Sequence, residues 1–204
     1  MDRLVCIGRR EGSKDASAWR SSAGWWTATI VLVLGMSTGP SLAFDAKALE
    51  GLKAKPVCEG CDLAGADLKD AYFPGVILRK SNLMNADLSG GNFNGANLES
   101  ANFTGADLTG ANLKYSVLTN AVFWGARLAG TQLAGAKLDG SNLSGAMLKG
   151  AELRGARLSA ANLAGADLTG ANLEFAEGVD AAQLAEAILC KTRMPDGALN
   201  DSGC

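Results

Sequence analysis

Cysteines are the residues of this sequence whose type and spacing most suggest chemistry. A Cys-Glu-Gly-Cys motif places Cys58 and Cys61 three residues apart, as in redox-active pairs and in metal sites. Cys190 and Cys204 occur much later in the chain. Histidine is absent, so the commonest proton shuttle and the commonest metal ligand are both missing. The residue types therefore disfavour hydrolytic and zinc chemistry.

The charge balance and the composition indicate a repetitive stack and disfavour a nucleic-acid partner. The 204 residues include 19 basic and 21 acidic side chains, a net charge of −2, which provides no basic field for phosphates. Apolar residues make up 48% of the chain but aromatic residues only 6%, and 26 residues are Gly. The apolar share thus consists of small and aliphatic side chains, which suits a stack of short repeats.

Residues 1–43 are typical of a signal peptide. Basic residues precede an apolar run at 25–36, and Ser41 and Ala43 supply small side chains for a cut before Phe44. We therefore expect export to the periplasm or the extracellular space, which leaves 14 basic and 18 acidic side chains, a net charge of −4. The alternatives are a signal that stays anchored in the membrane, or the thylakoid lumen of a phototroph.

A period of five residues dominates the rest of the chain. From Leu63 to Leu173 every fifth residue is Leu or Phe, at 23 consecutive positions, and the residue two places earlier is Ala in 16 of the 23 units. A step of five spreads these side chains around an α-helix and sends them to alternate faces of a flat strand. The pattern therefore predicts a backbone that turns once per repeat and returns every Leu to one interior.

These units resemble a known repeat. Residues 96–100, Ala-Asn-Leu-Glu-Ser, and 166–170, Ala-Asp-Leu-Thr-Gly, are similar to the A(D/N)LXX signature of the pentapeptide repeat family, and the cysteine-bearing ends are similar to the flanks of exported bacterial members. The resemblance implies an all-β solenoid, a right-handed quadrilateral β-helix in which four pentapeptides form one coil. We assign residues 58–178 to this β-helix. Residues twenty apart then become neighbours, so we expect Phe73 beneath Phe93 and Phe103 beneath Phe123.

Short capping helices are expected at both ends of the stack. Residues 44–57 form an N-terminal capping segment with a helix at 45–52, and residues 179–204 form a C-terminal capping helix and a disulfide-closed tail. Asp180 and Gln183 match a capping box, which predicts a helix from Asp180 to about residue 187. The alternative is that the coils resume one residue out of phase. The residues that would then point inward are Leu184, Leu189 and Met194.

The β-helix separates the two cysteine pairs. Cys58 and Cys61 belong to the first coil, whereas Cys190 and Cys204 lie at the other end, about 25 Å away. This distance excludes one shared metal site, so we expect disulfides within each pair, the second closing a loop of about 15 residues. Cleavage of the signal removes Cys6 and leaves four cysteines. An even number of cysteines is expected for a chain that matures in an oxidising compartment. A reactive redox pair at the first motif is the alternative.

Outward positions form columns with a spacing of twenty residues. Asp67, Asp87 and Asp107 fall in one column, where three carboxylates could gather a calcium ion. The favoured interpretation is that each carboxylate bonds the backbone of its own turn, because uncharged asparagines fill the same place on the next face. The sequence thus predicts no metal site. Those asparagines are Asn82, Asn102, Asn142 and Asn162.

Four apolar residues occupy outward positions that elsewhere hold Asn, Ser, Thr or Lys. They are Tyr115, Val117, Val122 and Trp124, and together they predict an apolar patch on the stack. Such a patch would contact a protein partner or a second copy of the chain. The alternative is that the stack merely tolerates apolar side chains at these positions.

The function expected from these features is that of an exported, non-enzymatic rod that acts as a rigid scaffold or protein-interaction surface. The sequence contains no paired nucleophile and base and no phosphate loop, and a filled core leaves no pocket. We therefore expect no catalytic residue, no cofactor, no small-molecule substrate, no nucleic-acid partner and no membrane contact after signal cleavage. The alternative is a DNA-mimic topoisomerase (gyrase) inhibitor or resistance-type protein, since some family members resemble a DNA duplex in shape and charge. The export signal and the mixed surface charge disfavour that alternative.

Overall fold

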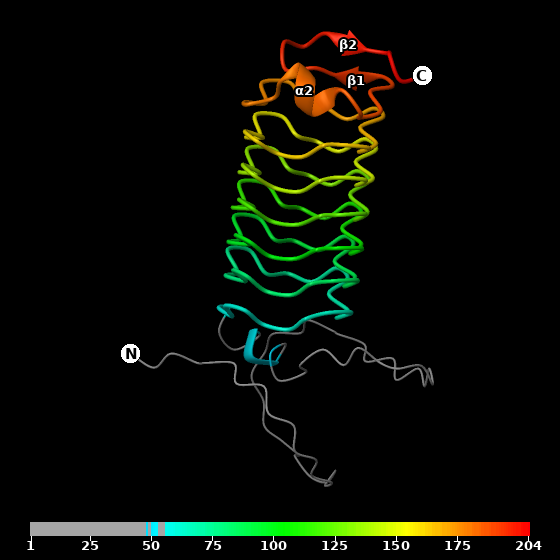
Figure 1. Cartoon of the computed structure of the whole chain (residues 1–204). Helices are drawn as coiled ribbons and strands as arrows, with labels where there is room; N and C mark the ends of the chain where they lie inside the picture. Colours follow the sequence, from blue (N-terminus) through cyan, green and yellow to red (C-terminus); the bar gives the residue numbers. More distant parts are fainter. Residues whose placement is uncertain (1–47, 49, 53–55) are drawn as a thin grey trace, which may run out of the picture. The chain divides into compact units, whose positions relative to one another are not determined.

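The computed structural model describes residue 48, residues 50–52 and residues 56–204 (Figure 1). The predicted signal peptide, residues 1–43, lies outside the described residues, as does most of the predicted N-terminal capping segment. Residue 48 and residues 50–52 have helical backbone, and Ala48 and Leu52 are buried in the hydrophobic core. A capping role for this segment stays a prediction. None of the helices within the described residues has the length and hydropathy needed to cross a membrane.

From residue 57 onward the chain winds into a stack of four-sided coils (Figure 1). One residue of each pentapeptide forms parallel bridges to the residues twenty places before and after it, so the bridges run in four separate ladders, one for each face. We name the faces A to D in chain order. The bridged residues of face A are Val57, Ile77, Asn97, Val117, Lys137, Arg157 and Glu177; those of face B are Asp62, Asn82, Asn102, Val122, Asn142 and Asn162. Those of face C are Asp67, Asp87, Asp107, Arg127, Met147, Asp167 and Ile188; those of face D are Tyr72, Asn92, Asn112, Gln132, Glu152, Asn172 and Arg193.

The core is the column of Leu and Phe side chains that the period of five predicts. All of these central residues are buried except Phe73, which is half-buried in the first coil. The rings of Phe103 and Phe123 stack with centroids 4.8 Å apart, and those of Phe73 and Phe93 lie 6.4 Å apart with a tilt of 32°. The predicted pairing of Phe residues twenty apart is therefore confirmed.

The turn at each corner comes from one residue with left-handed backbone. Every fifth residue from Gly60 to Phe175 has a φ between 52° and 70°. Most of these residues are Gly, which adopts this conformation without steric cost, and Asn and Asp tolerate it. Tyr115 and Phe175 also adopt it, which is unusual for bulky side chains.

Backbone hydrogen bonds join each coil to the next. The N–H of Asn82 donates to the carbonyl of Cys61 at 2.8 Å, and its own carbonyl accepts the N–H of Leu63 at 2.7 Å. The same pair of bonds recurs along the four ladders. Each coil therefore acts as the template for its neighbour, and an isolated coil would leave these groups unpaired.

The regular stack is interrupted after residue 177. Helix α2 (Ala181–Leu184) begins at the N-cap Asp180 with the predicted capping box, but it is shorter than the predicted helix. The Gln183 side-chain amide donates to the carbonyls of Leu158 at 2.8 Å and Ala161 at 3.0 Å. The Gln183 amide thus replaces part of the backbone hydrogen bonding that a further strand of face B would provide.

After α2 the chain rejoins the stack one residue out of phase, as the alternative interpretation predicted. Asp167 bridges Ile188 and Asn172 bridges Arg193, a step of 21 instead of 20. Leu184 and Leu189 are buried, and Met194 packs against the core. The bridges thus extend beyond residue 178, the predicted end of the β-helix.

The chain closes with a hairpin of two short antiparallel strands, β1 (Thr192–Arg193) and β2 (Leu199–Asn200). The connection is a tight turn in which the Gly197 N–H donates to the Met194 carbonyl at 2.9 Å. Because Arg193 also belongs to the ladder of face D, the hairpin lies on the last coil.

We expect Leu118→Ala to lower the free energy of unfolding by about 2 to 5 kcal/mol, because it leaves a cavity in a fully buried column. Lys69→Ala, at an exposed corner, is the control and should change the value by less than about 0.5 kcal/mol. Chemical denaturation followed by circular dichroism measures both. A similar effect of the two substitutions would contradict the assignment of Leu118 to the core.

Candidate functional site

The four residues of the predicted apolar patch do not form one surface. Val117 lies on face A and Val122 on face B, and both are half-buried. Tyr115 is 68% exposed at the turn from face D to face A, whereas Trp124 is 60% exposed at the turn from face B to face C. These two turns are opposite corners of the coil, since each turn leads to the next face. The structure therefore divides the predicted patch between separate sides of the stack.

The corner that carries Tyr115 holds a second exposed aromatic residue. Phe175 is 58% exposed at the equivalent turn position three coils later. The guanidinium carbon of Arg154 lies 5.0 Å from the centre of the Phe175 ring, in a cation–π contact. Phe175 was not among the predicted interface residues, although a bulky aromatic residue at a position that usually holds Gly is a signal that could have identified it.

We call this surface the DA corner, and Gly occupies the two turn positions between its aromatic residues. Backbone hydrogen bonds from Tyr115 to Ala134 and from Gly135 to Arg154, both 3.0 Å, stack these turns directly. The DA corner consists of Lys114, Tyr115, Gly135, Arg154, Gly155 and Phe175.

Basic side chains surround the part of the DA corner next to Tyr115. Lys114 belongs to the same turn, and Lys137 is exposed on face A. Within the described part of the chain neither lysine forms an ion pair, whereas Arg157 pairs with Asp139 at 3.3 Å. Positive charge next to exposed aromatic rings is a combination that can recognise an anionic ligand.

The aspartate column on face C bonds its own turns, as the favoured interpretation predicted. Oδ1 of Asp87 and Oδ1 of Asp107 accept the backbone N–H two residues later, each at 2.9 Å. On face B Asn102 accepts the equivalent N–H at 3.0 Å. Among the residues that the structure describes, no group of three or more Cys, Asp or Glu side chains is placed to hold a metal ion. The column therefore has a structural explanation that needs no calcium.

Two aspartates of face C have lowered pKa values. Burial raises the pKa of Asp107, but the nearby hydroxyl of Thr109, the hydrogen bond from the Thr109 N–H and the charge of Arg127 outweigh it, so the pKa lies below its ordinary value of 3.8. Burial likewise opposes ionisation of Asp167, yet its pKa is lowered by the hydrogen bonds from Thr169 and by Lys149. Both carboxylates are therefore held ionised by their own turns and by a neighbouring cation.

The cysteines pair within each end of the chain. A disulfide joins Cys58 and Cys61, whose Cα atoms are 5.7 Å apart, and another joins Cys190 and Cys204, with Cα atoms 4.6 Å apart. Cys61 is fully buried, whereas Cys58 is half-buried against the hydrophobic core. Because reactive cysteines are partly exposed, burial favours a structural role for Cys61, and the redox alternative stays a prediction for Cys58.

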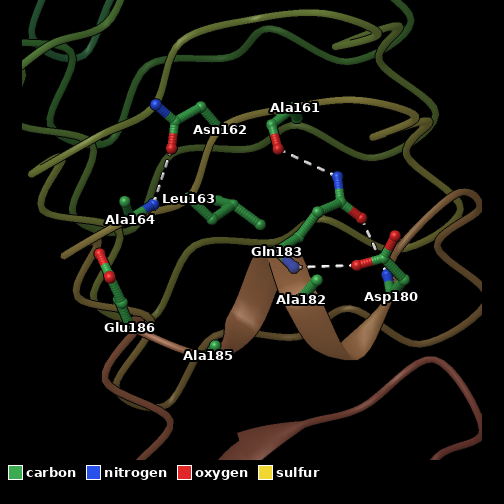
Figure 2. Close-up of a pocket in the computed structure, with 9 residues that line it drawn as sticks. All are labelled: Ala161, Asn162, Leu163, Ala164, Asp180, Ala182, Gln183, Ala185 and Glu186. Atoms are coloured by element: carbon green, nitrogen blue, oxygen red, sulfur yellow. Dashed lines mark hydrogen bonds between the residues drawn. The ribbon is translucent and has the colours of Figure 1, made fainter.

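A depression of about 350 Å³ lies beside α2, between that helix and the strand of face B at residues 161–164 (Figure 2). Three of its four polar side chains already serve the fold. Gln183 Nε2 donates to Ala161, Gln183 N–H donates to Asp180, and Asn162 accepts the N–H of Ala164. The fourth is Glu186, and the remaining lining consists of Ala residues and Leu163. No Ser, Thr, Cys or Lys lines the depression to act as a nucleophile beside the Glu186 carboxylate.

Comparison with protein families found a match to the model described as "Pentapeptide repeats (8 copies)", at residues 57–90, 81–120, 106–145, 116–155 and 138–174. A comparison with curated proteins found no match.

Solved structures with the same fold include a trypsin-treated variant of QnrB1, a plasmid-mediated fluoroquinolone resistance protein. It is 21% identical, with 72% of this chain and 75% of that chain covered and a TM-score of 0.58. HetL, a pentapeptide repeat protein involved in heterocyst differentiation regulation from the cyanobacterium Nostoc sp. strain PCC 7120, is 23% identical. The match covers 78% of this chain and all of HetL, with a TM-score of 0.35. At these identities the likeness to QnrB1 shows the fold alone, and the TM-score of HetL is too low to support an argument.

We expect the stability of the protein to fall in acid partly through Asp107 and Asp167. Because their folded-state pKa values are lowered, their contribution is complete above the unfolded-state pKa of about 3.9 and is lost as the pH falls through the folded-state values. The double variant Asp107→Asn and Asp167→Asn keeps an oxygen acceptor for each turn, as Asn102 does. Thermal unfolding between about pH 6 and pH 2 should show a smaller loss for this variant than for the unchanged protein. Equal losses would contradict the prediction.

Removal of the second disulfide should loosen the C-terminal hairpin. Replacing Cys190 and Cys204 by Ser removes a link worth about 3 kcal/mol for a loop of this length. Hydrogen exchange of the Met194 N–H, which donates to Ala198, should accelerate, while exchange of the Leu118 N–H in the middle of the stack should not change. Unchanged exchange at Met194 would show that the disulfide does not hold the hairpin.

Proposed function

Because the chain belongs to the pentapeptide repeat family, whose members are typically non-enzymatic, we propose that it is an exported, non-enzymatic scaffold that binds a protein partner along the sides of its coils. The observation that carries this proposal is the filled interior. Leu108 and Leu128 lie at the axis with no exposure to solvent, and the equivalent residues of the other units are buried except Phe73, which is half-buried in the first coil. A ligand therefore meets the outward side chains of the turns and ladders, and recognition must occur there.

The regular spacing of the outward side chains supports this role. Hydrogen bonds between coils hold each outward position at about 4.8 Å from the next position of its column. Side chains that are ordered before binding lose less conformational entropy when a partner arrives. A stack of this kind is therefore suited to binding an extended partner across several coils.

Export is proposed from the pattern of residues 1–43 and from the cysteines. A basic segment, an apolar run and small residues before Phe44 are typical of a cleaved signal. The two disulfides are compatible with an oxidising compartment, since disulfides are rare where thiols are kept reduced.

The topoisomerase-inhibitor alternative receives no support from the surface charges. A duplex mimic needs a continuous acidic surface, but the aspartate column of face C is followed by Arg127, and face A carries Lys137 and Arg157. We therefore expect the purified protein to leave gyrase supercoiling unchanged.

Export and lateral binding can be tested together in cells that produce the chain with a C-terminal tag. We expect the tagged protein in the exported fraction, with a mass that corresponds to a start at Phe44. A photo-crosslinking amino acid at outward positions of faces A to D, one position at a time, should give a discrete protein adduct on at least one face. Tagged protein with an intact N-terminus in the cytoplasm would contradict export, and no adduct on any face would contradict the scaffold proposal. Samples without illumination are the control.

A further inference from the structure

The DA corner contains a gap between its two exposed aromatic residues. The ring of Tyr115 leans over Gly135, where an added Cβ would meet its Cδ1 at 2.7 Å. An added Cβ at Gly155 would meet nothing within 4 Å. Phe175 follows one coil later, and the guanidinium carbon of Arg154 lies 5.0 Å from the centre of its ring. The gap over Gly155 is therefore bounded by the Tyr115 ring on one side and by the Arg154–Phe175 pair on the other. From the turn of Gly135 to the turn of Phe175 is two coils, or about 10 Å.

Both aromatic residues adopt a backbone conformation that disfavours them. Tyr115 has a φ of 57° and Phe175 a φ of 61°, where Gly is the common residue of this chain. Bulky residues in this conformation are outliers, and such outliers concentrate at functional positions. Neither residue contributes to the core, since most of each side chain is exposed. The exposed parts of both rings are thus available for a contact outside the stack.

The charges around the gap determine the charge of the ligand that can bind there. Lys114 and Lys137 lack an ion pair within the described residues, and Arg154 adds a third positive charge against the Phe175 ring. The acidic residues flank the Phe175 side of the gap, and they are Glu152 on face D, Glu174 beside Phe175 and Glu177 on face A. A ligand would therefore place its carboxylates toward the Tyr115 side of the gap.

We infer that the DA corner binds an acidic peptide segment whose single aromatic side chain inserts over Gly155, between the ring of Tyr115 and the Arg154 guanidinium that lies against Phe175. The carboxylates that flank this side chain meet Lys114 and Lys137. The inference rests on the proposed function and adds the chemistry of the partner and its position on the stack.

The probe is a fluorescein-labelled peptide with three glutamates on each side of one tryptophan, titrated with the purified protein and followed by fluorescence anisotropy. We expect saturable binding that weakens with salt, and binding at least about tenfold weaker for the same peptide with Ser in place of Trp. Tyr115→Ser and Gly155→Asn should each weaken binding by about tenfold, and Lys137→Ala by a smaller factor.

The chain offers a matched control for the filled gap. Gly95→Asn lies in the same column, with a φ of 64°, open space around its Cβ and an aromatic residue, Tyr115, one coil later. This control differs from Gly155→Asn in lying outside the gap, so the affinity of the Gly95→Asn variant for the tryptophan peptide should stay within about twofold of that of the unchanged protein. The same is expected of Trp124→Ser, on the opposite corner. Asn85 and Asn120 adopt the required backbone, and thermal unfolding checks that each variant is folded. If Gly155→Asn does not fold, Tyr115→Ser decides, since Ser100 adopts the same conformation.

Four results would overturn the inference. The first is no saturable binding of the tryptophan peptide, the second is equal binding of the serine peptide, and the third is equal weakening by Gly95→Asn and Gly155→Asn. The fourth is that alginate displaces the labelled peptide as well as unlabelled peptide does at equal carboxylate concentration, because the site would then recognise negative charge alone. If photo-crosslinking still finds a protein on another face, the scaffold proposal survives and only the DA corner assignment fails.

Discussion

The left-handed turn at every fifth residue is the constraint on which the rest of the structure depends. It bends the backbone at each corner, so the small residue and the central Leu or Phe of every unit point to one axis. It also leaves the strand between two turns short, with hydrogen-bonding groups that only a neighbouring coil can satisfy. Stability therefore comes from stacking and not from any single coil. A side chain at the axis touches the coils above and below it, which is why the Phe103 and Phe123 rings stack.

The same turn decides what the outside of the stack can present. Gly is the residue that this backbone accepts most easily, and a column of Gly leaves a bare corner. Larger side chains at these positions lean over the next coil, as Tyr115 does over Gly135 and Asn85 does over Gly105. A residue at a turn is thus coupled to the residue twenty places later. The DA corner shows this coupling, since Gly135 accommodates the Tyr115 ring and Gly155 leaves open the space between that ring and Phe175.

The C-terminal end shows how the stack tolerates an irregularity. One extra residue shifts the bridges from a step of 20 to a step of 21, and α2 absorbs the shift on face B. The Gln183 amide replaces part of the missing strand by donating to two carbonyls. The chain then returns to faces C and D in register with the core, because Leu184 and Leu189 still reach the interior. The hairpin and the Cys190–Cys204 disulfide complete this end.

The sequence by itself determined the period, the inward residues, the pairing of Phe residues and the capping box, because each of these depends on local repetition or on residues a few positions apart. The tertiary structure decided which outward residues share a surface. Tyr115 and Trp124 are nine positions apart in the sequence yet lie on opposite corners, while Tyr115 and Phe175 are sixty positions apart and share one. It also decided that α2 and the out-of-phase stack occur together, where the sequence had offered them as alternatives. The physical reason is that a coil brings together residues twenty apart only after it has closed, and the side chains of a corner acquire their neighbours only when the next coil is in place.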